Sequence, residues 1–585
     1  MTAPRYNLLD EPHIRVLPLG LLTLPGLLAA LARDEVEGFP ALRPHQVPLW
    51  HMFLVQLAAL ALHGAGETAI PADEHDWKRL LRGLTTRNFP DDEPWCLLVN
   101  DWTKPAFMQP PVPPGVDLEK TIQSPDALDL LITSKNHDLK QAVARDGTVE
   151  DWVFALMTQQ TGGTYDVQNA HTIRTGNIYA PRVCMGLAPM FPNRPMNQFP
   201  RPGAWFHRDV QTLLKYRSSL DEMPLDYQKK GEVGLTWIEQ WQNGESLQTS
   251  NLDIWFIEAC RRIRITSDER SIYARKKPER TPRVVGPCVE KTNDSHAKKK
   301  SNKNERVVRI KDPWTPEHKT DNKVFTLTEK GFSYKDLVKI LFGENDSQNW
   351  TLPILLEPSK DDLNNYDNLF IVAYGLAGKR DKAGTLGFHS RILPLSGKVS
   401  RALGPKRAEL HQLAQNQMKA IAEFNVALRE ALISAAEKGS KSNKDKDHEE
   451  EGNEDEGNKD KGRKGKGTRI KKKLDIYTLT ACGHLDRYAD SIFFERLWVR
   501  FEAQELGAKA LHTEEEEFTR LLWDRTQKIF AEALPAMPCT GLFRHRAEAR
   551  ARQKLKAAIR KKYPDLFTPA TTPDTDQENA DDASR

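Results

Sequence analysis

Residues 130–140 read LLITSKNHDLK and residues 161–182 read TGGTYDVQNAHTIRTGNIYAPR. The apolar segment between them, with Trp152 and Phe154, predicts a helix that ends in a loop at Gly162-Gly163. Glycine lets the backbone turn sharply or pass close to a ligand, because it has no β-carbon. Side chains around these glycines can donate hydrogen bonds to phosphate and to base edges; they are Thr161, Thr164, Tyr165, Gln168, Asn169, His171, Thr172, Arg174 and Asn177.

By composition alone, the same stretch also fits an ordinary polar surface loop. A resemblance favours nucleic-acid binding. The run Ile132–Asp138, the glycine loop and Gly186–Pro189 resemble the large subunit of the type I-E CRISPR Cascade surveillance complex, the CasA family. Further matches follow the same order, and together they span roughly residues 5 to 395; they are Asn7–Pro12, Pro105–Pro110, Cys260–Arg264 and Asp312–Pro316.

The resemblance implies a non-catalytic, DNA- and RNA-binding subunit in antiviral defence. It would recognise the protospacer-adjacent motif in duplex DNA, help to open the duplex for guide RNA pairing, and recruit a helicase-nuclease. Its expected partners are the other Cascade subunits, the CRISPR guide RNA, double-stranded target DNA and that helicase-nuclease, with no membrane. The implied motif-sensing residues are Thr161, Gly162, Gly163, Thr164 and Tyr165, and the implied loop near the end of the guide contains Ser134, Lys135 and Asn136.

A basic tract follows the glycine loop; it comprises Arg261, Arg262, Arg264, Arg270, Arg275, Lys276, Lys277, Arg280, Arg283, Lys298, Lys299, Lys300 and Lys303. Such a local excess of cations is typical of phosphate contact, although a charge run can equally be a solvated face. Alternation with Ile272, Tyr273, Val284 and Val285 predicts a hairpin with charged residues at its exposed tip. By resemblance, a lysine of this hairpin reaches the minor groove, and Lys276 and Lys277 are both candidates.

A second hairpin is predicted from Leu369–Tyr374 and Arg391–Leu395, with its tip at Gly378–Gly384. The resemblance implies that this tip, at Asp381 and Lys382, acts as a wedge that starts strand separation. Many relatives have glutamine where this chain has Lys382. Lysine can contact phosphate or a base edge but stacks poorly, and a charged hairpin turn is the alternative.

The fold class expected is α+β, with a large mixed N-terminal domain over residues 1–397 and a C-terminal four-helix bundle over 398–566. A strand pair and a short helix are expected within residues 5–30, a buried helix over Pro48–His63, and a strand over Trp95–Val99. Apolar stripes at helical spacing predict the four bundle helices. The last of them is rich in Arg and Lys, from Arg544 to Lys562, which fits either a solvated face or contact with a nucleic-acid backbone.

Two segments lack the apolar residues needed to fold: a charged insertion at about residues 439–473 and a tail at 567–585, both expected to be disordered.

The chain has 585 residues and a net charge of +4, so affinity for nucleic acid must come from local patches. Its six cysteines form no CxxC pair, and no metal or cofactor is expected. Prolines interrupt the leucine-rich run Leu17–Leu31, and no membrane span is evident, so a cytoplasmic protein is expected.

An alternative function is a metal-dependent nuclease that uses His137, Asp138 and His171. A sequential His-Asp pair supplies no converging geometry by itself. A purely structural scaffold is a third class. Unlike the DNA-binding subunit, such a scaffold would lose no DNA affinity when Lys276, Lys277 and Lys382 are neutralised.

Overall fold

The structure is a computed structural model, and it describes residues 4–130, 147–162, 182–190, 200–220, 233–242, 245–268, 271–277, 283–285, 311–318, 324–343, 350–366, 369–378, 385–437 and 459–567. The chain divides into two compact units, Met1–Ala408 and Glu409–Arg585. The division falls after helix α10 (Gly397–Ala402), and therefore later in the chain than the predicted boundary at residue 397.

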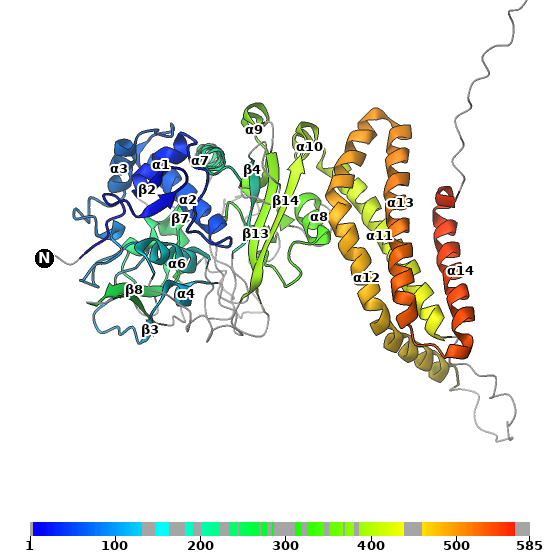
Figure 1. Ribbon diagram of the computed structural model, residues 1–585. Coiled ribbons are helices and arrows are strands. Elements are labelled where there is room, and N and C mark those ends of the chain that lie inside the picture. Colours follow the sequence, from blue (N-terminus) through cyan, green and yellow to red (C-terminus); the bar gives the residue numbers. More distant parts are fainter. Residues whose placement is uncertain are drawn as a thin grey trace, which may run out of the picture. The chain divides into compact units, whose positions relative to one another are not determined.

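The first unit is built around helix α2 (Val47–Ala65), which is buried from Pro48 to Leu62. Its neighbours include α3 (Glu74–Gly83), α6 (Val149–Gly162) and α7 (Pro202–Ser219) (Figure 1). Among the described helices, α2 alone is long and apolar enough to cross a membrane, and 83% of its most apolar window is buried. We therefore assign α2 as a core helix. The remaining helices of this unit are α1 (Leu24–Ala32), α4 (Pro125–Leu128), α8 (Tyr334–Phe342), α9 (Lys360–Asn365) and α10.

The described strands form small sheets rather than one large one. Two of these sheets have three strands. The first has the order β3-β9-β8 and consists of β3 (Lys120–Ile122), β8 (Arg262–Ser267) and β9 (Ile272–Lys277). The second has the order β14-β13-β4 and consists of β4 (Cys184–Pro189), β13 (Leu369–Gly378) and β14 (Thr385–Leu395). The two-stranded pairs are β1 (Ile14–Val16) with β2 (Gly20–Leu22), β5 (Val233–Leu235) with β7 (Leu252–Ile257), β6 (Leu247–Gln248) with β10 (Val284–Val285), and β11 (Glu317–His318) with β12 (Trp350–Thr351).

The N-terminal prediction of a strand pair and a helix is confirmed by β1, β2 and α1. Helix α1 begins after Thr23, whose hydroxyl oxygen accepts a hydrogen bond from the Gly26 backbone N–H at 2.9 Å. The strand predicted over Trp95–Val99 is wrong. A 3-10 turn (Glu93–Trp95) precedes a single bridge between Cys96 and Asn7, because the Trp95 N–H bonds to Asp92 rather than to a strand.

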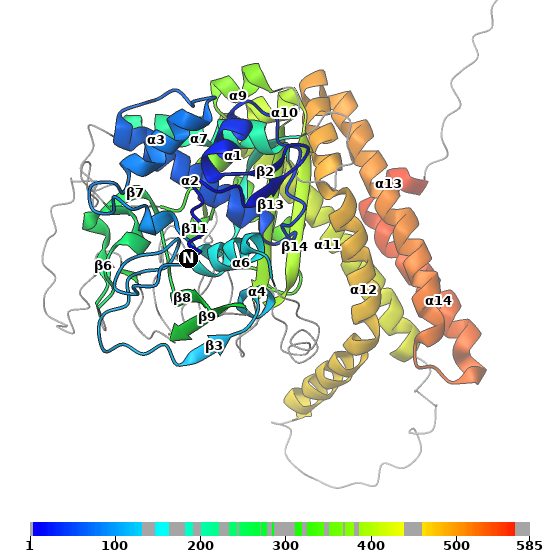
Figure 2. The ribbon, with the colours of Figure 1, turned by 60° about the vertical axis from the view of Figure 1, so that its left-hand side comes forward.

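The second unit contains the long helices α11 (Arg407–Glu437), α12 (Lys459–Leu506), α13 (Ala508–Ala533) and α14 (Arg544–Lys562), which lie side by side in Figures 1 and 2. The predicted α+β class with a C-terminal helix bundle is confirmed. Buried stripes from all four helices meet in its core; they include Leu428, Phe493, Leu497, Phe518, Ile529, Leu555 and Ile559. Gln417 joins α11 to α12 by donating to the Phe493 carbonyl oxygen at 2.7 Å.

The predicted disorder over 439–473 is partly wrong, because α12 already begins at Lys459. Extending a helix that is packed further along costs less than nucleating one, and Lys and Arg are good helix formers. The remainder of the insertion, residues 438–458, and the tail after Phe567 lie outside the described residues.

Candidate nucleic-acid interface

Helix α6 carries the predicted glycine loop at its C-terminal end, as expected, but its last two residues are buried. The Thr161 hydroxyl donates to the Met157 carbonyl oxygen at 2.9 Å. A β-carbon added to Gly162 would lie 2.5 Å from Leu49 Cδ1 on α2. Packing against α2 therefore requires glycine at position 162, and neither residue offers a surface to a ligand. Gly163, Thr164 and Tyr165 lie outside the described residues.

Gln160 joins the end of α6 to the segment that leads into β8. Its Oε1 accepts from the Arg261 backbone N–H at 2.7 Å, and its Nε2 donates to the Arg261 carbonyl oxygen at 2.9 Å. The same Nε2 donates to the Met108 carbonyl oxygen at 2.8 Å. The Gln160 side chain is fully buried, so these bonds tie the end of α6 to the backbone of Arg261 and Met108.

Lys276 and Lys277 lie at the end of β9, which pairs with β8. The predicted hairpin of Ile272-Tyr273 with Val284-Val285 is wrong, because β10 (Val284–Val285) pairs with β6 and not with β9, so these lysines are not at a hairpin tip. The turn joins Ser267 to Ile272, whereas Lys276 and Lys277 pair with Ile263 and Arg262 at the opposite end. Both lysines are half-buried.

The hairpin register follows from burial of apolar side chains. Ile263, Ile265 and Ala274 face the core, and this fixes the pairing because a slip of one residue would turn them to the other face of the sheet. Lys277 is thereby held opposite Arg262, the residue after Arg261, to which Gln160 bonds. The end of β9 and the end of α6 are therefore linked through Arg261 and Arg262.

Leu130, the last described residue before the predicted guide loop, also lies near the end of α6. A β-carbon on Gly162 would lie 3.2 Å from Leu130 Cδ1, and Leu130 directly precedes the 131–146 segment. The neighbouring Asp129 is buried and receives hydrogen bonds from His45 Nε2 at 2.8 Å and Arg43 Nη1 at 2.9 Å. Burial would raise the pKa of Asp129, but the hydrogen bond and charge of His45 and the charge of Arg43 hold it below its usual value.

Ser134, Lys135 and Asn136 lie outside the described residues, as do the three candidate nuclease residues His137, Asp138 and His171. Neither the guide-loop prediction nor the nuclease alternative is therefore tested by side-chain geometry.

The second predicted hairpin is confirmed as β13 and β14. Its tip, with Asp381 and Lys382, lies outside the described residues. Strand β13 runs antiparallel to β4 and extends beyond Cys184, the first residue of β4, which pairs with Tyr374. A β-carbon on Gly375 would lie 3.2 Å from Val183 Cγ2.

Three arginines of the predicted basic tract are buried and cannot contact phosphate. Arg264 donates to the carbonyl oxygens of Val99 and Lys104, both at 3.0 Å, and burial lowers its pKa to about 9. Arg262 and Arg283 lie over the Trp241 ring, with 4.9 and 5.2 Å from each guanidinium carbon to the ring centroid.

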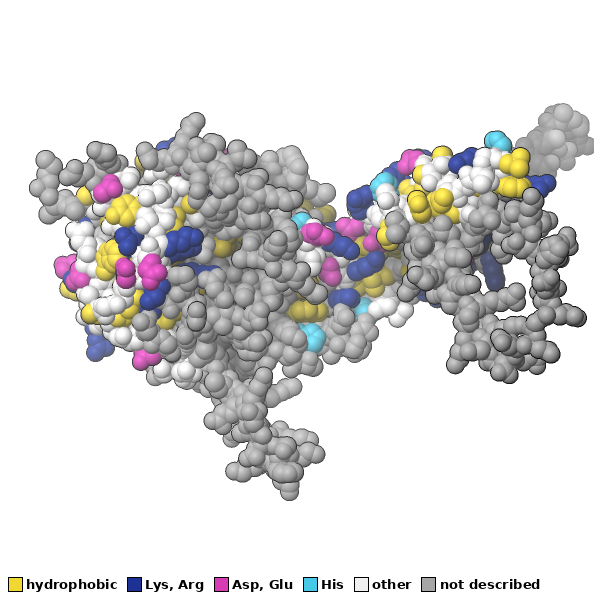
Figure 3. Space-filling view, turned by 90° about the horizontal axis from the view of Figure 1, so that it is seen from below, with side chains coloured by type: hydrophobic (Ala, Val, Ile, Leu, Met, Phe, Trp, Pro, Cys, Tyr) yellow, Lys and Arg dark blue, Asp and Glu magenta, His cyan; other side chains and the backbone are white. Residues whose placement is uncertain are grey.

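The basic surface of α14 is partly neutralised from α11. Lys562 Nζ lies 2.7 Å from Glu423 Oε1, and Lys554 Nζ lies 3.7 Å from Glu430 Oε2. The sequence-based expectation considered only acids near α14 itself and missed these partners. Among the described residues of the face drawn in Figure 3, basic, acidic and hydrophobic side chains are interspersed. Nucleic-acid contacts on that part of the surface would therefore be local.

The mixed α+β unit and the helix bundle together define a known fold, that of the large subunit of CRISPR surveillance complexes. The chain is similar in structure to CasA (Cse1) from Thermus thermophilus, with a TM-score of 0.55, 14% sequence identity, and coverage of 96% of this chain and 100% of the other. It is also similar to Cse1 from Acidimicrobium ferrooxidans, with a TM-score of 0.56, 12% identity, and coverage of 97% and 100%.

A chain in a structure described as a CRISPR RNA-guided surveillance complex matches with a TM-score of 0.51 and 12% identity, covering 97% of this chain and 100% of that one. No protein-family model matches the sequence, and no curated protein is similar to it at a significant level. The resemblance inferred from short motifs is thus confirmed at the level of the fold.

Proposed function

We propose that this chain is the non-catalytic large subunit of a type I-E Cascade complex, which recognises the protospacer-adjacent motif and helps to open target DNA. The observation that carries the proposal is the CasA fold over almost the whole chain. A second support is the convergence of three predicted contact elements, which emerge around Leu130, Gly162 and Lys277.

In this proposal, Thr161, Gly162, Gly163, Thr164 and Tyr165 belong to the loop that contacts the DNA, and the buried Thr161 and Gly162 form its base. Lys276 or Lys277 reaches the minor groove beside the motif. The groove offers only a degenerate hydrogen-bond pattern, so shape and a few polar edges are read there. Ser134, Lys135 and Asn136 lie beside the end of the guide RNA.

Asp381 and Lys382 act at the point where the duplex opens. Unstacking a base step costs a few kcal/mol, which contacts made only in the opened form would offset. Lysine contributes phosphate or base-edge contacts rather than stacking. Specificity for the remaining target sequence is left to guide RNA pairing.

The proposed partners are the other Cascade subunits, the guide RNA, the target duplex and a helicase-nuclease that is recruited after the duplex has opened. Such an assembly would work in the cytoplasm. The subunit supplies binding, positioning and duplex opening, and leaves strand cleavage to the recruited enzyme.

The decisive experiment is a gel shift with the assembled complex on duplexes that differ only in the bases beside the protospacer. Lys382→Ala should weaken binding to a fully paired target by about tenfold, and much less to a target with a pre-opened bubble at that position. Arg87→Ala, an exposed change of the same charge, should bind both duplexes as the wild type does. Equal binding of all flanking sequences by the wild type would contradict motif recognition.

The nuclease alternative makes a separate prediction. Purified protein with Mg²⁺ or Mn²⁺ would cleave DNA, and His137→Ala would abolish cleavage. The proposed function predicts no cleavage by wild type or variant until the helicase-nuclease is added.

A further inference from the structure

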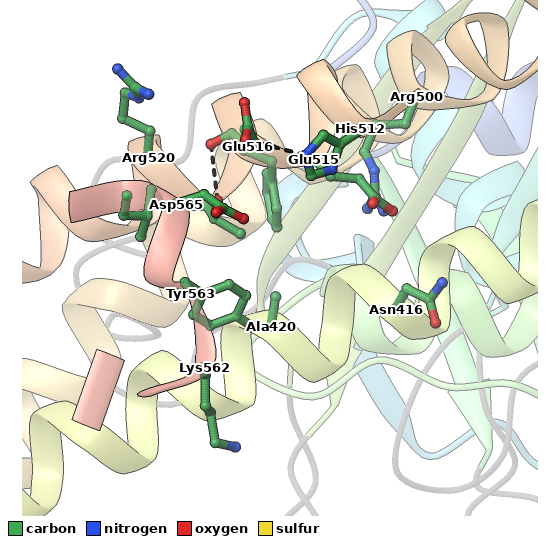
Figure 4. A pocket seen from close by; sticks show the side chains of 13 residues that line it. Asn416, Ala420, Arg500, His512, Glu515, Glu516, Arg520, Lys562, Tyr563 and Asp565 are labelled. Atoms are coloured by element: carbon green, nitrogen blue, oxygen red, sulfur yellow. Dashed lines mark hydrogen bonds and ion pairs between the residues drawn. The ribbon is translucent and has the colours of Figure 1, made fainter. Parts of the chain in front are cut away.

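The helix bundle contains a group of metal-ligating side chains for which the proposed function has no use. His512 and Glu516 lie one turn apart on α13, and Asp565 lies in the short 3-10 helix η7 (Pro564–Phe567). One potential ligand atom from each residue lies within 4.8 Å of the other two. Figure 4 shows the three side chains turned toward the same space, from two different elements.

The spacing fits a small tetrahedral cation. Zinc binds nitrogen and oxygen ligands at about 2.0–2.2 Å, so two ligands of one tetrahedral ion are about 3.4 Å apart. His512 Nε2 lies 3.3 Å from Glu516 Oε1, which already matches that separation. One carboxylate oxygen of the exposed Asp565 lies within 4.8 Å of a ligand atom of each of the other two residues.

The backbone that carries Asp565 is fixed on both sides. Before it, Tyr563 stacks on Phe424 with ring centroids 5.3 Å apart, and after it Phe567 packs against Trp523 with centroids 5.4 Å apart. The third ligand therefore comes from a segment that is already held against the helices. Such preorganisation lowers the entropic cost of binding an ion.

The charges around the three side chains favour a cation. Two carboxylates approach each other, and two of the three Arg and Lys residues that line the same hollow are engaged elsewhere: Arg500 with Glu515 at 2.5 Å and Lys562 with Glu423 at 2.7 Å, while Arg520 is the third. The three residues also line a hollow of about 210 Å³, which has room for a metal-bound water or another fourth ligand.

We propose that His512, Glu516 and Asp565 form a binding site for one divalent transition-metal cation, for which Zn²⁺ fits best. One imidazole nitrogen with two carboxylates suits a borderline ion, whereas Mg²⁺ and Ca²⁺ prefer oxygen ligands alone. The bound ion joins α13 to the segment that follows α14, and so fastens the last helix of the bundle to its neighbour.

The test uses the full-length chain after treatment with a chelator. Isothermal titration with Zn²⁺ should show one saturable site, and Co²⁺ should give the visible absorption of a tetrahedral complex. His512→Ala and Asp565→Asn should each weaken Zn²⁺ binding by at least about tenfold and remove the Co²⁺ band. Two exposed residues outside the cluster provide controls, and His545→Ala and Glu532→Gln should bind as the wild type does.

Thermal unfolding supplies a second readout, because an ion that binds only the folded state raises the melting temperature. Zn²⁺ should raise it in the wild type and in both controls, and not in His512→Ala or Asp565→Asn. The substituted side chains are exposed, so these variants keep the helix bundle intact. Saturable binding unchanged in both variants, or no saturable binding by the wild type, overturns the proposal. No DNA is involved, so the result is independent of the proposed function.

Discussion

The Gln160 side chain holds both backbone groups of Arg261, accepting from its N–H at 2.7 Å and donating to its carbonyl oxygen at 2.9 Å. A single buried amide thereby ties the end of α6 to the start of β8. Of the elements proposed to contact DNA, the glycine segment begins two residues after Gln160, and Lys277 lies on the strand beside β8. Their relative placement therefore depends in part on this side chain, together with the hydrogen bond from the Cys260 backbone N–H to the Gln160 carbonyl oxygen at 3.3 Å.

Gln160→Ala should lower the free energy of unfolding by about 3 kcal/mol, because it leaves the Arg261 N–H and the Met108 carbonyl oxygen buried without this partner. Urea denaturation followed by tryptophan fluorescence measures the loss. The control is Gln159→Ala, since Gln159 is also buried on α6 but bonds through its backbone. Equal destabilisation by both variants would remove the special role of Gln160.

Gly162→Ala should destabilise the protein by about 1–3 kcal/mol, because the new β-carbon would overlap Leu49 on α2. Gly64→Ala on α2 is the matched control: its β-carbon would meet only Leu84 Cδ2, at 3.6 Å, and alanine favours the helix. Thermal melts of the two variants compare these effects. A Gly162→Ala protein of wild-type stability and reduced DNA affinity would instead point to contact with the ligand.

Helix α2 and the β13–β14 hairpin of the first unit were predictable from local sequence. Pro48–His63 has a continuous apolar composition that only a core helix explains, and α2 matches it to within two residues at each end. Leu369–Tyr374 and Arg391–Leu395 are likewise recognisable as strands, because β-type apolar runs flank a glycine-rich turn.

The burial of individual polar residues could not be predicted in this way. Arg262 and Arg264 belong to a basic tract in sequence, yet both are enclosed because Trp241 and the 99–104 segment, distant in the chain, cover the face of β8 on which they lie. The possible metal ligands His512 and Asp565 are also far apart in sequence. Only the fold brings them together, so their spacing in the sequence does not indicate a metal site.

Replacing both Lys276 and Lys277 with alanine should weaken DNA binding by the assembled complex equally for all target sequences. The slope of log affinity against log salt concentration should fall by about 2, because each lost phosphate contact releases about one counterion fewer. Arg87→Ala, exposed and of the same charge type, should leave the slope unchanged. Gel shifts over a range of salt concentrations measure this slope. An unaltered slope in the double variant would mean that neither lysine contacts phosphate.

Acid should destabilise the first unit through His51. Its Nε2 lies 2.8 Å from Asp209 and its ring stacks on Trp205 at 3.4 Å between centroids. Burial lowers the pKa of His51 below its usual value, although the hydrogen bond to Asp209 opposes that shift. Below a pH of about 6.5, the unfolded chain therefore binds a proton at this position that the folded chain does not, and stability falls as the pH decreases.

His51→Gln removes this titration and should flatten the pH dependence of unfolding. Between pH 7 and pH 5, the free energy of unfolding should decrease less in the variant than in the wild type, with a difference of at most about 1.4 kcal/mol per pH unit. At pH 8 the variant should be less stable than the wild type, because the stack on Trp205 is lost. Urea titrations at several pH values measure both effects. Parallel pH profiles for the two proteins would show that His51 is protonated equally in the folded and unfolded states, and that its burial does not govern the acid sensitivity of this unit.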